Sequence, residues 1–205
     1  MNTINITRRI QEQCESLPEG TVLSAKALLH LGSRAAVDQA LSRLARSGHL
    51  LRVGRGLYSP PVRSGFGTRG PRPEKLVEGL ASLTGETIAP GGASSANTLG
   101  LTTQVPVRSV YLTSGQSRQL RLGSQVLELR HAPAWQLYAP TSPAGQALRA
   151  LAWLGPAHVG EAVKALRFCL PPLEQRALVS ARARMPSWLA EVVSRAFCED
   201  ASAGA

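Results

Sequence analysis

The chain has 205 residues, which is enough for one domain or two small ones and for a substantial core. Hydrophobic residues make up 43% of it but aromatic residues only 4%, so we expect an aliphatic core. The formal net charge is +10, and residues 1–72 carry 11 Lys and Arg against 4 Asp and Glu, a net charge of +7. Such a basic part is typical of a nucleic-acid-binding surface. The absence of a long apolar span argues against a membrane protein.

The chemistry-bearing residues do not form a known metal or cofactor motif. Cys14, Cys169 and Cys198 are far apart and odd in number, which predicts neither a disulfide framework nor a zinc site. The Gly91-Gly92 pair lacks the Lys and hydroxyl of a phosphate-binding loop, so we expect no cofactor and no metal. The opening M-N-T-I-N-I-T-R-R lacks the apolar segment of a signal peptide, and we therefore expect a cytoplasmic protein.

A helix-turn-helix pattern follows an expected N-terminal helix. Ser24 is placed to cap a helix over residues 25–31, and Gly32 is expected to end it in the left-handed conformation. Ser33 is placed to cap a second helix that runs to about Ser47. Two helices joined by so tight a corner predict a helix-turn-helix.

The second helix is amphipathic. Val37, Ala40, Leu41 and Leu44 recur at helical spacing and predict one buried stripe. Arg pairs bidentately with guanine and Gln with adenine, so the opposite face suits a major groove. We predict that DNA is contacted by the cap, the first turn, this outer face and its flanks: Ser33, Arg34, Ala35, Asp38, Gln39, Ser42, Arg43 and Arg46.

A short hairpin is expected directly after this helix. Residues 50–53 favour a strand, Gly54-Arg55-Gly56 a tight turn, and Leu57-Tyr58 a return strand. We interpret it as a wing that pairs with a short strand at residues 20–23 and whose Arg52 and Arg55 reach phosphates or a minor groove. For each Arg alone, a solvated surface is the simpler interpretation. The whole constellation favours binding of double-stranded DNA.

The predicted fold class is α+β, with two domains. Residues 1–62 form the winged helix-turn-helix domain, and residues 63–72, rich in Gly, Pro, Ser and Arg, form a linker. Residues 73–205 form a mixed domain with a small antiparallel sheet and C-terminal helices. Its expected elements are a helix from Pro73, a short helix over 93–99, a strand over 107–112, a hairpin turning at Gly123-Ser124 with Leu120 opposite Leu127, and helices from Ser142 onward. Residues 199–205 are expected to be disordered.

Two blocks of sequence resemble the AbiEi family, antitoxins of type IV toxin–antitoxin systems, which act in abortive infection as a phage defence. S-R-A-A-V-D-Q-A-L-S-R-L-A-R-S-G with G-R-G-L-Y-S resembles the N-terminal helix and wing of that family. L-T-T-Q-V-P with Y-L-T-S-G resembles the centre of its second domain, and the likeness covers about residues 20–155.

The resemblance implies an N-terminal domain that binds an operator and represses its own operon. It also implies a second domain that counteracts a nucleotidyltransferase-like toxin, without requiring a stable complex with that toxin. On DNA the protein is expected to act as a homodimer or as monomers on repeated sites.

Other functions fit the residues less well. A nuclease requires acidic residues and a Lys around a strand, but Glu86 and Glu128 lie in no such motif and the four histidines show no ligand spacing. We therefore expect no enzyme activity. A stand-alone winged-helix regulator remains the first alternative, and a nuclease-like DNA-processing protein ranks below it. A protein-interaction adaptor is a further alternative, and the basic hairpin argues against it.

Overall fold

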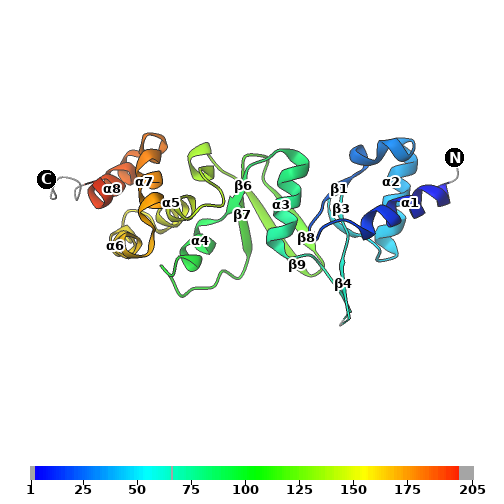
Figure 1. Cartoon of the computed structure of the whole chain (residues 1–205), viewed down its shortest axis with the longest axis horizontal. Helices are drawn as coiled ribbons and strands as arrows, with labels where there is room; N and C mark the ends of the chain where they lie inside the picture. The colour runs from blue at the N-terminus through cyan, green and yellow to red at the C-terminus, as the bar shows by residue number, and fades with distance from the viewer. Residues whose placement is uncertain (1–2, 66, 199–205) are drawn as a thin grey trace. The chain divides into compact units, whose positions relative to one another are not determined.

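The computed structural model describes residues 3–65 and 67–198, which form a mixed α+β fold with small antiparallel sheets and many helices (Figure 1). The chain divides into two compact units. Unit 1 comprises the described residues up to Glu86 together with Arg118–Glu128, and unit 2 comprises Thr87–Ser117 and the described residues from Leu129 onward. The expected division at residues 63–72 therefore differs from the observed one, since unit 1 also contains a helix and a hairpin from beyond that segment.

Unit 1 begins with helices and short strands. Its elements are α1 (Thr3–Glu15), β1 (Leu23–Ser24), the 3₁₀ helix η1 (Ala25–Leu31), α2 (Arg34–Arg46), β2 (Leu51–Gly54), β3 (Leu57–Ser59), β4 (Val62–Ser64), β5 (Gly67–Arg69), α3 (Pro73–Thr84), β8 (Arg118–Leu122) and the first part of β9 (Gln125–His131).

Both predicted helix caps are present. The Ser24 hydroxyl accepts a hydrogen bond from the Ala27 N–H, and the Ser33 hydroxyl accepts one from the Ala36 N–H, each at 3.4 Å. The first helix is a 3₁₀ helix rather than an α-helix. The expectation of a left-handed Gly32 is wrong, because its φ of 166° is extended backbone. Gly32 is instead required by space, since a Cβ there would lie 2.7 Å from Cδ1 of Ile6.

A three-stranded antiparallel sheet in the order β1-β3-β2 follows these helices. Leu23 pairs with Tyr58, so the predicted pairing of an N-terminal strand with the hairpin is confirmed, although this strand is Leu23–Ser24 rather than residues 20–23. The aliphatic core beneath joins α1, η1, α2 and the sheet: Ile6, Ile10, Ala25, Leu28, Leu31, Val37, Ala40, Leu41, Leu44, Leu50 and Tyr58.

The expected linker contains a hairpin. β4 and β5 pair antiparallel, with Val62 opposite Arg69. The Glu19 carboxylate accepts hydrogen bonds from Nη1 of Arg69 at 3.0 Å and from the Arg72 N–H at 2.8 Å. The hydrogen bond from the Arg69 side chain is the larger cause, and that from the Arg72 N–H the next, of a pKa of Glu19 below its usual value. These contacts, made by a residue about 50 positions earlier, keep the segment on unit 1.

The leucine hairpin β8–β9 has the expected alternation. Leu120, Leu122, Leu127 and Leu129 are all buried, whereas Gln119, Arg121 and Arg130 are exposed. The strands hydrogen-bond in the order β6-β7-β9-β8. Within unit 1, a Cβ on Gly54 would lie 3.4 Å from Leu120, and one on Gly70 3.1 Å from Leu122. The hairpin thus packs against β2 and the segment after β5.

Unit 2 contains the rest of this sheet and a helical bundle. Its elements are β6 (Ile88–Pro90), α4 (Gly92–Thr98), β7 (Ser109–Thr113), the end of β9, the 3₁₀ helix η2 (Ala134–Leu137), α5 (Pro143–Leu154), α6 (Val159–Cys169), α7 (Pro172–Ser180), the 3₁₀ helix η3 (Ala181–Arg184) and α8 (Ser187–Cys198). The last four α-helices gather around one apolar core that includes Leu148, Leu166, Leu178 and Leu189 (Figure 1).

Two further expectations concern membrane-spanning helices and the C-terminal residues. In the described part of the chain, no helix combines the length and the apolar character that crossing a bilayer requires. The expectation of disorder at residues 199–205 lies outside the described residues.

The close approach of α3 to the chain at Gly20 yields a stability prediction. A Cβ on Gly79 would lie 2.1 Å from the backbone oxygen of Gly20, which cannot swing away as a side chain does. We expect Gly79→Ala to lower the free energy of unfolding by about 1–3 kcal/mol, measured by denaturant titration followed by circular dichroism.

The neighbouring Glu78→Ala is the control. It removes only the exposed ion pair with Lys75 and should change the free energy of unfolding by no more than about 0.5 kcal/mol. An unchanged or raised stability for Gly79→Ala would show that this backbone approach is not tight.

Candidate nucleic-acid interface

Helix α2 buries one face completely and leaves the other in solvent. Val37, Ala40 and Leu41 are 0% exposed and Leu44 is 2% exposed. These side chains pack against α1 and η1, so the rotation of α2 about its own axis is determined by its neighbours. The residues on the opposite side of the helix are therefore held outward.

The start of α2 is already partly occupied by internal contacts. The Ser33 hydroxyl caps the helix by accepting from Ala36. Nε of Arg34 donates to Oδ2 of Asp38 at 2.9 Å, with 63% and 48% of the two side chains exposed. An ion pair so exposed contributes little stability, since water screens both charges. Arg34 can therefore exchange Asp38 for another anion at low cost. Ala35 beside them is exposed.

The middle and end of α2 carry the free polar groups. Gln39, Arg43 and Arg46 are exposed, and within the described residues none of their side chains makes a hydrogen bond or ion pair. Ser42 is half-buried. Two unpaired guanidinium groups and an amide on one helix face leave all their donors available to an anionic or polar partner.

The hairpin β2–β3 presents two more unpaired cations. Arg52 lies on β2 opposite Tyr58, and Arg55 lies at the two-residue turn with Gly56, whose φ of 69° only glycine adopts easily. Both Arg side chains are exposed, and neither has a partner among the described residues. Tyr58 is 4% exposed and anchors the hairpin in the core.

One additional exposed cation lies on the next hairpin. Arg63 is on β4, exposed and without a partner in the part of the chain that is described, whereas Arg69 on β5 pairs with Glu19. The composition of residues 63–72 predicts a linker, so no local feature of the sequence indicates that Arg63 and Arg69 lie on strands. Only the charge of the segment identifies them.

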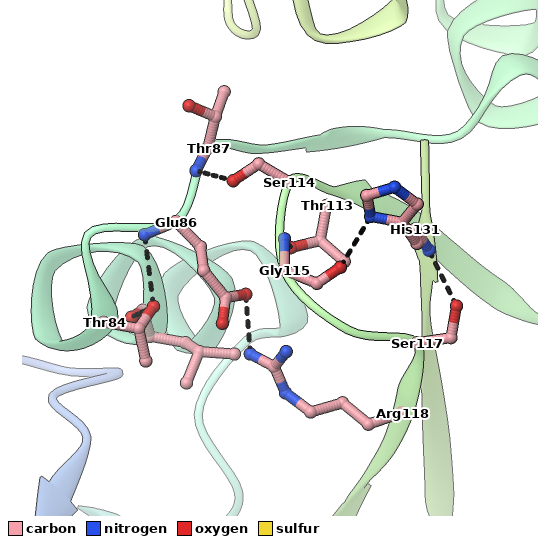
Figure 2. A network of polar contacts seen from close by, with 10 residues as sticks. Thr84, Glu86, Thr87, Thr113, Ser114, Gly115, Ser117, Arg118 and His131 are labelled. Carbon is pink, nitrogen blue, oxygen red and sulfur yellow. Dashed lines mark hydrogen bonds and ion pairs between the residues drawn. The ribbon is translucent and has the colours of Figure 1, made fainter. Parts of the chain in front are cut away.

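Two of the residues weighed for a nuclease, Glu86 and His131, have structural partners (Figure 2). Within unit 1, Glu86 pairs with Nη2 of Arg118 at 2.8 Å. Within unit 2, Nδ1 of His131 lies 2.9 Å from the Gly115 backbone oxygen. No group of three or more His, Cys, Asp or Glu that could hold a metal ion occurs among the residues described. The turn between β7 and β8 is held by the contact of His131 with Gly115 and by the Ser117 hydroxyl, which accepts a hydrogen bond from the His131 N–H at 2.8 Å.

Comparison with known proteins adds a family and a fold. Residues 9–169 match a family described as a family of unknown function (DUF6088), a range that extends from α1 to the end of α6. No curated protein matches the chain. The fold is similar to the crystal structure of the RV2827C protein from Mycobacterium tuberculosis, at 14% identity and a TM-score of 0.52, over 94% of this chain and 76% of that chain. Because the family match spans well over half of its length, the protein belongs to DUF6088.

Proposed function

We propose that β1, η1, α2, β2 and β3 act as a winged helix-turn-helix that binds double-stranded DNA. The observation that carries the proposal is the one-sidedness of α2: an entirely buried stripe on one face, and exposed, unpaired Gln39, Arg43 and Arg46 on the other. An amphipathic helix of this kind fits a major groove, where guanidinium and amide groups read base edges.

The hairpin β2–β3 supplies the second part of the proposed interface. Arg55 at its turn and Arg52 on its first strand are exposed cations on a short, anchored element, which suits contact with phosphates. Arg63 on the following hairpin adds a further phosphate contact. The net charge of +7 over residues 1–72 attracts DNA to this part of the chain at long range.

The biological role that we propose is repression of the protein's own operon combined with antitoxin action against a nucleotidyltransferase-like toxin. The support is the resemblance of two sequence blocks to the AbiEi family. The first block includes α2 and residues 54–59 of the hairpin, and the second, within residues 101–115, lies entirely in unit 2. The alternative is a stand-alone winged-helix regulator, which would bind DNA but would not counteract a toxin.

The first functional prediction separates base reading from phosphate anchoring. Arg43→Ala should remove a base contact worth about 1–3 kcal/mol and so narrow the gap in affinity between operator and random DNA. Arg55→Ala should weaken binding to both DNAs alike and reduce the slope of log affinity against log salt by about one unit. Titrations of both variants against both DNAs at several salt concentrations measure this.

Arg121→Ala is the matched control, because Arg121 is an exposed arginine of unit 1 on β8, outside the proposed interface. It should leave discrimination unchanged. If Arg55→Ala abolished discrimination while Arg43→Ala preserved it, the hairpin and not α2 would read the sequence. Equal affinity of the unmodified protein for operator and random DNA would contradict sequence-specific binding altogether.

The second functional prediction tests the antitoxin role in the full-length chain. A fragment from residue 73 onward would separate α3 and β8 from the rest of unit 1 and expose Leu76, Leu80 and Leu120, all at most 1% exposed. Such a fragment is unsuitable for the test, so the full-length double variant Arg43→Ala/Arg46→Ala, expressed from an unrelated promoter, is used instead. Because it lacks two arginines of the proposed DNA interface, we expect the native promoter to be derepressed. The same variant should still rescue cells from the toxin encoded in the same operon.

Promoter-reporter activity and colony counts after toxin induction measure the two effects. Loss of rescue in the double variant, at a normal protein level, would mean that antitoxin action depends on DNA binding. A neighbouring gene that is harmless without this protein would leave the stand-alone regulator as the better description.

A further inference from the structure

Unit 2 contains a cavity of about 280 Å³ that the proposed DNA interface does not use. The start of α4, strand β7 and helix α5 form its walls. Three arginines line it, Arg108, Arg130 and Arg149, and no Asp or Glu is among its lining residues. A cavity with three guanidinium groups and no carboxylate favours an anionic ligand.

Arg149 is the least expected of these residues, because it is only 1% exposed and is the one charged residue of α5. Its Nη1 donates to the backbone oxygens of Gln136 and Tyr138 at 3.3 and 3.4 Å, and its Nη2 donates to that of Pro140 at 2.8 Å. Its Nε is buried and has no hydrogen-bond partner. Among the described residues, no carboxylate pairs with it.

A buried guanidinium with only carbonyl partners is costly, since its charge has left water without meeting an opposite charge. Burial lowers the pKa of Arg149 to about 10, so the group stays protonated at neutral pH. An anion in the cavity would compensate this charge. Binding an anion there would therefore recover part of the free energy that is lost when the Arg149 guanidinium is removed from water.

Trp153 gives the same cavity an aromatic wall. The side chain lines the cavity and is 46% exposed, an unusual exposure for a large ring beside a helical core. Helix α5 lies close to α4 here, because a Cβ on Gly92 would lie 2.4 Å from Cβ of Trp153 and 2.6 Å from the Arg149 backbone oxygen. An exposed aromatic ring in the lining of a cavity can stack on a flat ring of a ligand, as nucleobases stack on aromatic side chains.

We propose that this cavity binds a free mononucleotide, with its phosphate held by the arginines of the cavity and its base stacked on Trp153. The volume lies just below the range of about 300–1,000 Å³ that is usual for ligand sites, which fits one nucleotide rather than a dinucleotide. Arg108 and Arg130 are both exposed, and Arg108 has no partner within the described chain, so its guanidinium is free to bind phosphate. The inference does not depend on the DNA-binding proposal.

Titration of the full-length protein with nucleoside mono- and triphosphates, followed by calorimetry and by tryptophan fluorescence, tests the proposal. At least one nucleotide should bind, and the corresponding nucleoside and inorganic phosphate should each bind at least 10-fold more weakly. Arg108→Glu should reduce nucleotide affinity at least 10-fold, and Trp153→Leu should reduce it while abolishing the fluorescence change. Arg149 is left in place because its removal would strip three backbone oxygens of their donors.

Two matched variants control for non-specific charge effects. Arg121 lies outside the cavity and Arg46 lies on the proposed DNA face. The variants Arg121→Glu and Arg46→Glu should each bind the nucleotide with an affinity within twofold of that of the unmodified protein. The proposal is overturned if no nucleotide binds at millimolar concentration, or if inorganic phosphate binds as well as every nucleotide. It is also overturned if Arg108→Glu binds normally, or if only single-stranded oligonucleotides bind.

Discussion

The packing of the α2 stripe against α1 and η1 is the constraint on which the proposed interface depends. Because aromatic residues are scarce, this contact is built from small and branched aliphatic side chains that interdigitate closely: Ile10, Leu28 and Leu31 against Val37, Ala40, Leu41 and Leu44. Successive residues of a helix differ by about 100° around its axis. A shift of the stripe by one residue would therefore rotate Gln39 and Arg43 away from their present direction. The packing of the unit 1 core therefore determines the direction in which the outer arginines of α2 point.

Local signals in the sequence predicted the local structure well. The caps at Ser24 and Ser33, the α2 stripe, the β2–β3 hairpin and the leucine face of β8–β9 all depend on residues within a few positions of one another. The segment after the hairpin behaved differently. Gly and Pro composition reads as a linker there, but Glu19 binds Arg69 and the Arg72 N–H, and Gly70 lies against Leu122. Contacts between residues about 50 apart leave no periodicity to read, so the composition of unit 1 could not be predicted.

The two candidate sites differ in the same way. The outer face of α2 follows from helical spacing alone, so its exposed residues could be named from the sequence, apart from the pairing of Arg34 with Asp38. Arg149 could not be identified, because A-L-R-A-L-A-W-L indicates an apolar helix with one solvated charge. Its burial depends on the backbone oxygens of residues 136–140, which reach it only through the bend around η2. A charged residue in the middle of an apolar helix is the one signal that the sequence contains.

The arginines of the two sites also act through different physics. Arg43, Arg46 and Arg55 lie in water, where salt screens a charge over about 10 Å at 0.1 M, so their effect is collective and long-range at low salt. Arg149 lies out of water, where screening is weak and geometry decides which anion is accepted. Net charge therefore indicates the first kind of site and conceals the second. Residues 73–205 carry 12 Lys and Arg against 9 Asp and Glu, an unremarkable balance in which a carboxylate-free cavity lined by three arginines goes unseen.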